Sequence, residues 1–299
     1  MKFSTVILFA LLLFISAESF VAQSDSVDVN WELVFSGLDF PEGPAMDNNG
    51  NLYVSNCYGS WIGRFDGINV DTFLVKSDQY PSIDKTNGLV IMDDYIYACD
   101  YGLGAILKIS MLGDIEILSD GYDGEKFNRP NDIINDSKGN ILFTDPKSYG
   151  SDLLDGRIFS INTGTNEVKL IAESLAFPNG INISPIDSKV YVCESAKERI
   201  VRFDMSEHGI LVNKELFIEI PGGDPDGIEF DLEGNLYVAH FGGKAVYIIS
   251  PEGRIIGKIE TPGKKPTNLE IVYNEYKLLY LTEVETNSVY KLKLFDFTK

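Results

Sequence analysis

Histidine and cysteine are scarce in this sequence of 299 residues. The two histidines, His208 and His240, are too few for a histidine-rich metal site. The three cysteines, Cys57, Cys99 and Cys193, exclude a disulfide-stapled scaffold because their number is odd and low. One bridge and buried free thiols both stay open as alternatives. No cysteine or histidine spacing typical of a zinc site occurs.

Positive charge is also in short supply. The chain has 25 Lys and Arg against 45 Asp and Glu, which gives a formal net charge of −20 at pH 7. Nucleic-acid binding needs clustered cations to neutralise phosphates, so this balance argues strongly against such a partner. It also disfavours anionic membrane surfaces. The composition, 44% hydrophobic and 23% charged, is that of an ordinary globular protein, and the acidity suits one that captures cations.

Long apolar runs are absent except near the N-terminus. Lys2 precedes ten uninterrupted apolar residues, Val6 to Ile15, and the small residues Ser16 and Ala22 follow. A membrane-spanning helix needs about 20 apolar residues, so the pattern predicts a cleaved secretory signal over residues 1–22. An N-terminal anchor is the alternative. The protein is therefore expected to be secreted, extracellular or periplasmic, with no membrane contact after cleavage.

A repeat of about 45 residues is the most informative feature of the chain. Six β-forming segments align on a third position, which is occupied by Tyr53, Tyr97, Leu142, Tyr191, Tyr237 and Tyr280. These positions are 44, 45, 49, 46 and 43 residues apart. A second series lies 10 to 12 residues upstream, and its polar centres are Glu42, Asn87, Asn131, Asn179, Asp226 and Asn268. Two series with one period argue against chance.

Each repeat contains four short apolar stretches separated by turn signals. In the first repeat we expect strands at 43–47, 52–56, 61–66 and 70–76. Repeats of this length with four strands predict an all-β, six-bladed β-propeller over residues 28–299. The last repeat stops after its third strand, so residues 30–36 should complete the last blade and close the ring. A pair of β-sandwiches is the alternative, but it does not explain six repeats.

The six polar centres stand where the innermost strand of each blade should begin. They are therefore expected to converge on one face near the axis, as four amides and two carboxylates. Ca²⁺ takes six to eight oxygen ligands from such groups, and Zn²⁺ or Mn²⁺ can also use them. Pro-Asn-Gly and Pro-Asp-Gly are also ordinary turn sequences, so the repeat alone favours metal binding and plain turns equally.

An ordered set of short motifs stands at the blade spacing. They are Phe40–Ala45, Asn87–Leu89, Arg129–Asp132, Leu142–Pro146, Phe177–Ile181, Asp226–Ile228, His240–Gly243 and Pro266–Leu269. The set, which extends over about 40–294, resembles the gluconolactonase, regucalcin (senescence marker protein) and luciferin-regenerating enzyme family of six-bladed propellers. The squid-type diisopropyl fluorophosphatase is a more distant relative on the same scaffold. Glu270 stands where that phosphatase carries a His, which disfavours its pocket chemistry here.

The resemblance implies one divalent ion, held by a Glu, two Asn and an Asp from different blades. The matching residues are Glu42, Asn131, Asn179 and Asp226. Ca²⁺ is the expected ion, with Zn²⁺ or Mn²⁺ as alternatives. The resemblance also implies that Asp226 acts as base or nucleophile in opening a lactone, or serves as a ligand alone.

Further residues are expected to contact the substrate. The resemblance implies that Arg129 binds substrate hydroxyls or the carbonyl, with a surface ion pair as the alternative. Asn87 and Asn268 should line the pocket, and Asp132 should orient a neighbouring ligand or cap a turn. His240 ends a second strand, like Asn56, Asp100, Asp145, Glu194 and Glu283, and these six are expected to form a polar mouth. Tyr101, Tyr149 and Phe241 are expected to form apolar walls.

The sequence therefore predicts a secreted metal-dependent hydrolase that opens a small-molecule lactone or ester. A sugar lactone is the expected substrate, and neutral molecules are favoured because an acidic pocket repels anions. Organophosphate or ester hydrolysis at the same site is one alternative. A non-catalytic propeller that binds calcium or a ligand, and a protein-interaction propeller, are the others. The oligomeric state is open, with a monomer favoured.

Overall fold

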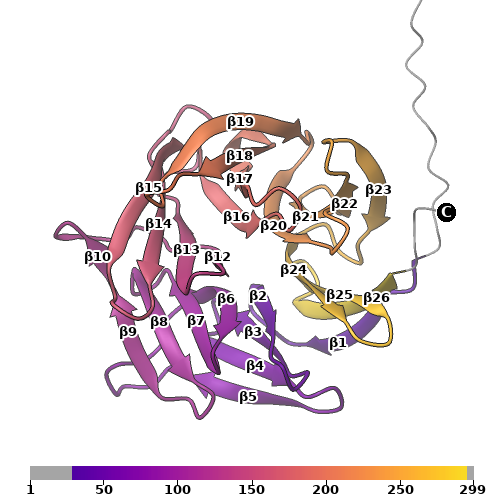
Figure 1. The fold of residues 1–299 in the computed structure, drawn as a ribbon. Coiled ribbons are helices and arrows are strands. Elements are labelled where there is room, and N and C mark those ends of the chain that lie inside the picture. The colour runs from indigo at the N-terminus through magenta and orange to yellow at the C-terminus, as the bar shows by residue number, and fades with distance from the viewer. Residues whose placement is uncertain (1–28, 295–299) are drawn as a thin grey trace, which may run out of the picture.

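Six four-stranded antiparallel sheets surround a central axis in the computed structural model, which describes residues 29–294 (Figure 1). The innermost strands are β2 (Pro41–Met46), β6 (Thr86–Met92), β12 (Ile133–Asn135), β16 (Pro178–Ile183), β20 (Asp224–Phe230) and β24 (Pro266–Tyr273). The predicted all-β, six-bladed propeller with four strands per blade is confirmed. The predicted leader, residues 1–22, lies outside the described residues.

The outer strands follow in chain order within each blade. They are β3 (Leu52–Asn56), β4 (Trp61–Phe65) and β5 (Val70–Val75); β7 (Tyr95–Asp100), β8 (Ala105–Ser110) and β9 (Ile115–Ser119); β13 (Asn140–Asp145), β14 (Gly156–Asn162) and β15 (Val168–Leu175). The later blades contain β17 (Val190–Glu194), β18 (Arg199–Met205) and β19 (Leu211–Glu219); β21 (Leu236–Phe241), β22 (Ala245–Ile249) and β23 (Ile255–Glu260); β25 (Lys277–Glu283) and β26 (Ser288–Leu294). A small hairpin, β10 (Gly121–Tyr122) and β11 (Glu125–Lys126), was not expected.

The ring is closed by the N-terminal strand, as predicted. Strand β1 (Glu32–Ser36) is hydrogen-bonded to β26, and the two lie side by side in Figure 1. Ser36 pairs with Ser288, and Glu32 pairs with Lys291. Because β1 covers the outer edge of the last blade's third strand, strands from the two ends of the chain hold the propeller together.

The repeated third position fills the space between neighbouring blades. Tyr53 packs edge-on against Phe73 at 5.0 Å and shares a buried cluster with Leu89 and Ile96 of the next blade. The only helix in the described part of the chain is the single turn η1 (Ser195–Lys197). None of the described helices has the length and apolarity that crossing a membrane requires. All three cysteines are buried free thiols.

The six side chains near the ends of the second strands are buried, so the expected polar mouth is wrong. Five of these side chains accept backbone N–H groups from the loop that enters their own blade: Asn56, Asp100, Asp145, Glu194 and Glu283. The sixth, His240, is 1% exposed, and its Nε2 lies 2.9 Å from the carbonyl oxygen of Ile220. These side chains fix the loops that carry the inner strands, because buried backbone N–H groups need partners.

Replacing Asp100 by Ala should lower the free energy of unfolding. Its carboxylate accepts the N–H groups of Asp84 at 2.6 Å and of Lys85 and Leu103 at 3.0 Å. Leaving these donors unpaired should cost roughly 3 kcal/mol. Urea unfolding measures the change, with Glu116→Ala on the exposed part of β9 as the control. A loss for Asp100→Ala no larger than the control's would show that the loop needs no such anchor.

Candidate active site

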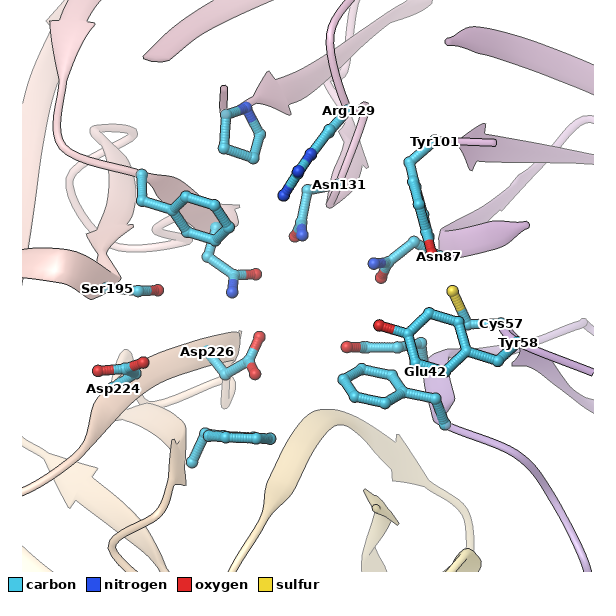
Figure 2. Close-up of a pocket in the computed structure, with 15 residues that line it drawn as sticks. Glu42, Cys57, Tyr58, Asn87, Tyr101, Arg129, Asn131, Ser195, Asp224 and Asp226 are labelled. Atoms are coloured by element: carbon cyan, nitrogen blue, oxygen red, sulfur yellow. The ribbon is translucent and has the colours of Figure 1, made fainter. Parts of the chain in front are cut away.

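A pocket of about 360 Å³ opens where the innermost strands begin (Figure 2). Six of the predicted site residues line it: Glu42, Asn87, Arg129, Asn131, Asn179 and Asp226. They come from five successive blades. Figure 2 shows the polar ends of Glu42, Asn87 and Asp226 turned toward the middle of the pocket. The convergence expected from the repeat is therefore present for these side chains.

In five of the six innermost strands, the pairing with the second strand is irregular at the polar centre. In β2 the register with β3 shifts between Glu42 and Ala45, and in β16 the register with β17 shifts between Pro178 and Ile181. A β-bulge re-aims a side chain that regular pleating would direct elsewhere. The third blade differs, because β12 begins after Asn131, whose N–H donates to the Thr144 carbonyl at 2.9 Å.

The glycine after the polar centre permits neighbouring blades to approach closely. A Cβ on Gly180 would lie 2.2 Å from the carbonyl oxygen of Asp226 in the next blade. A Cβ on Gly43, which has φ +44°, would lie 2.2 Å from the carbonyl oxygen of Asn87. Both distances are below any real van der Waals contact. The Pro-X-Gly sequences therefore pack the blades at the axis as well as forming turns.

Hydroxyl groups on the second strands fix the same backbone from the other side. Ser55 Oγ donates to the Asn87 carbonyl at 2.7 Å, and Thr144 Oγ1 donates to the Asn179 carbonyl at 2.8 Å. Each bond runs from one blade to the polar centre of the next. The positions of the polar centres are thus set by contacts between blades.

Replacing Gly180 by Ala should lower kcat/KM by about 100-fold, because displacing a catalytic group by about 1 Å can cost that much. The added methyl group must push the backbone at Asp226 away. Steady-state kinetics on a lactone measures the effect. Gly164→Ala is the control, since a Cβ there meets only the Asn162 side chain, at 3.5 Å. Equal kinetics for the two variants would show that this blade contact does not position the site.

Glu42 and Asp226 place two buried carboxyl groups in the pocket, 4% and 8% exposed. Burial, followed by repulsion from Asp226 and Asp132, raises the pKa of Glu42 well above its ordinary value. Burial, followed by repulsion from Asp132 and Asp224, likewise raises the pKa of Asp226. Neither carboxyl forms an ion pair within residues 29–294. A cation between them would remove this electrostatic cost.

The donor set fits a hard divalent cation only if the amides take part. Across the described residues, no three His, Cys, Asp or Glu side chains gather as a metal site would require. The pocket does combine the two carboxylates with the amide side chains of Asn131 and Asn179. Two carboxylate and two amide groups are oxygen donors of the kind that Ca²⁺ prefers.

Three predicted substrate-binding residues, Asp132, Asn268 and His240, do not line this pocket. Asp132 and Asn268 line a second cavity of about 240 Å³, which residues of all six innermost strands surround and which Glu229 and Glu270 also line. There Asn268 Nδ2 donates to Asp132 Oδ1 at 3.3 Å, and burial raises the pKa of Asp132 to about 6. None of the three residues, including the buried His240, contacts this pocket. Their role in substrate binding stays a prediction.

Several lining residues escaped the sequence argument: Phe40, Cys57, Tyr58, Pro146, Phe177, Ser195 and Asp224. Phe40, Phe177 and Asp224 each stand two residues before a polar centre, as Arg129 does. This third series was readable from the repeat. Tyr101 and Phe241 line the pocket as expected, whereas Tyr149 lies beside it, 5.2 Å from the Phe177 ring and bonded to Asp224.

A model of the SMP-30/gluconolactonase/LRE-like region matches residues 40–285. The chain belongs to this family. A gluconolactonase from Zymomonas mobilis is 29% identical over 269 residues, which cover 79% of this chain and 74% of the relative. Diisopropyl-fluorophosphatase from Loligo vulgaris is 26% identical over 279 residues, covering 84% and 88%. A solved gluconolactonase from Xanthomonas campestris is 25% identical, with a TM-score of 0.78 over 90% of each chain.

The comparisons confirm the family resemblance that the sequence motifs indicated. The gluconolactonase and the diisopropyl-fluorophosphatase carry the names of hydrolases, which supports a hydrolase on this propeller. The matched region begins at Phe40 and extends past the four residues expected to hold an ion.

Proposed function

We propose that this protein hydrolyses lactones in the pocket at the propeller axis. The observation that carries the proposal is the convergence of Glu42, Asn131, Asn179 and Asp226 from four blades, with two buried carboxyl groups that form no ion pair in residues 29–294. Membership of a family with gluconolactonases supports it.

Glu42, Asn131, Asn179 and Asp226 are the residues that would hold one divalent cation. The all-oxygen donor set favours Ca²⁺, and Zn²⁺ and Mn²⁺ are alternatives. When bound, such an ion supplies Lewis acidity at the lactone carbonyl oxygen and balances the two carboxylates.

Asp226 is proposed as the base or the nucleophile. As the base, its carboxylate takes a proton from a water molecule whose oxygen attacks the carbonyl carbon. The ring C–O bond then breaks, and the proton passes to the leaving alkoxide. As the nucleophile, a carboxylate oxygen bonds to the carbonyl carbon and displaces the ring alkoxide. Water then hydrolyses the resulting anhydride, which restores the Asp226 carboxylate, and the proton released goes to the alkoxide. Arg129, also in the pocket, can donate to the carbonyl or to substrate hydroxyls.

Hydrolysis of an organophosphate or an aryl ester at the same site is the second candidate, favoured by the similarity to diisopropyl-fluorophosphatase. A pH-stat assay with lactones, aryl esters and a phosphofluoridate separates the two. Turnover of lactones supports the first, whereas turnover confined to the phosphorus substrate supports the second. Ion or ligand binding without turnover of any of them would point to a binding protein.

Secretion is proposed on the leader predicted for residues 1–22. N-terminal sequencing of the chain expressed from its full sequence tests this, with a start near Gln23 expected.

A further inference from the structure

Aromatic side chains form much of the pocket wall around the polar floor. The apolar lining consists of Phe40, Tyr58, Tyr101, Pro146, Phe177 and Phe241. The rings of Phe40 and Tyr58 lie 4.7 Å apart, and Tyr58 is half exposed at the rim. The wall therefore offers ring faces to any part of a ligand that extends from the floor.

Two polar groups beside these rings are already paired with other protein groups. Ser195 Oγ donates to the Pro225 carbonyl at 2.7 Å. The Tyr149 hydroxyl lies 2.9 Å from both carboxylate oxygens of Asp224. Outside the four proposed ligands, the lining groups that can bind substrate hydroxyls are the side chains of Asn87 and Arg129 and the phenol hydroxyls of Tyr58 and Tyr101. Hydroxyls placed against the ring faces of Phe40, Phe177 and Phe241 would lose water without gaining partners, which is costly.

Two of the rings occupy backbone positions where a large residue is strained. Phe40 has φ 62° and Phe177 has φ 51°, which lie in the left-handed region that glycine adopts without cost. Backbone geometry alone would thus favour glycine at both positions. Both rings line the pocket, so their place in the wall offers a use for them that glycine cannot provide.

We infer that the substrates are lactones with an apolar alkyl or aryl substituent, which lies against this aromatic wall. The inference rests on the proposed lactone hydrolysis and departs from the sugar lactone expected from the sequence. The lactone carbonyl lies over the polar floor of the pocket, and the substituent replaces water against the rings of Phe40, Tyr58 and Phe177. The site can distinguish an apolar substituent from a hydroxylated one because hydroxyls of the substrate find no hydrogen-bond partners on the ring faces.

The test compares δ-nonanolactone with δ-gluconolactone, since both are δ-lactones with a secondary alkoxide as the leaving group. For each, kcat/KM is divided by the uncatalysed hydrolysis rate, because the two rings differ in intrinsic reactivity. The expected ratio favours δ-nonanolactone by about 10-fold or more. Tyr58→Ser and Phe177→Gly should each lower that ratio several-fold. Tyr80→Ser, at a tyrosine that is 86% exposed and outside the pocket lining, should leave it unchanged.

The outcomes separate the two proposals. Faster normalised turnover of δ-gluconolactone would overturn the apolar-substituent inference while leaving lactone hydrolysis intact. A preference for δ-nonanolactone that persists in folded Tyr58→Ser and Phe177→Gly proteins would remove the aromatic wall as its cause. No turnover of either lactone, or of unsubstituted δ-valerolactone, with Ca²⁺, Mn²⁺ or Zn²⁺ supplied would reject the proposed function itself.

Discussion

Asp226→Asn is expected to lower kcat for lactone hydrolysis by about 10²- to 10⁴-fold, the range over which a positioned base contributes. The amide oxygen can still serve as an oxygen donor, but the side chain can no longer accept a proton or attack a carbonyl. Asp226 lines the pocket and is 8% exposed, so solvent cannot easily take over its role. Single-turnover and steady-state kinetics measure the loss, with bound metal determined on the same sample.

The matched control is Asp224→Asn, because Asp224 also lines the pocket but its carboxylate is engaged by the Tyr149 hydroxyl. We expect a smaller loss there. Full metal content with unchanged kcat in Asp226→Asn would reduce Asp226 to a ligand. A single turnover in heavy-oxygen water separates the two mechanisms. The label enters the product when water attacks the lactone. It enters Asp226 when water attacks the anhydride at the carboxyl carbon of Asp226.

Glu42→Gln should lower kcat/KM by about 100-fold or more, since Lewis-acid stabilisation is worth several kcal/mol and each 1.4 kcal/mol is about tenfold. Glu42 is 4% exposed, and its buried carboxylate supplies half of the negative charge that would balance a dication with Asp226. Removing that charge should weaken metal binding. Isothermal titration with Ca²⁺, Mn²⁺ and Zn²⁺, beside lactone kinetics, measures both effects.

Chelation of the unmodified protein should abolish turnover, and one of the three ions should restore it. Glu116→Gln, in an exposed position on β9, should behave like the unmodified protein. Turnover that survives complete chelation would contradict metal dependence, and normal ion binding by Glu42→Gln would remove Glu42 from the ligand set.

The strands were predictable because they follow local patterns. In the first blade the expected ranges 52–56 and 61–66 became Leu52–Asn56 and Trp61–Phe65. The closing strand was predictable too, since a last repeat with three strands leaves one sheet edge for β1 to cover. The repeat also brought the Glu42 and Asp226 positions together on one face, because equivalent residues of a closed ring face a common axis.

The same reasoning failed where side-chain direction depends on contacts between blades. Asn268 belongs to the same series as Asn87, yet it lies with Asp132 in the second cavity while Asn87 lines the pocket. His240 stands one residue before the end of β21, and the carbonyl oxygen of Ile220 in the neighbouring loop is the hydrogen-bond partner of its ring. Sequence spacing gives neither the bulge geometry nor the approach of the next loop.

The sequence by itself determined the number of blades, the ring closure and the face that carries the polar centres, since these follow from the repeat period and strand alternation. Only the tertiary structure decided which polar centres meet in the pocket and which line the second cavity. It also decided that strand-end carboxylates such as Asp100 anchor loops, and that Phe40 and Phe177 turn their rings into the wall. The physical reason is that these outcomes depend on packing between blades, which is so close that a Cβ added to Gly180 would lie 2.2 Å from the Asp226 carbonyl oxygen.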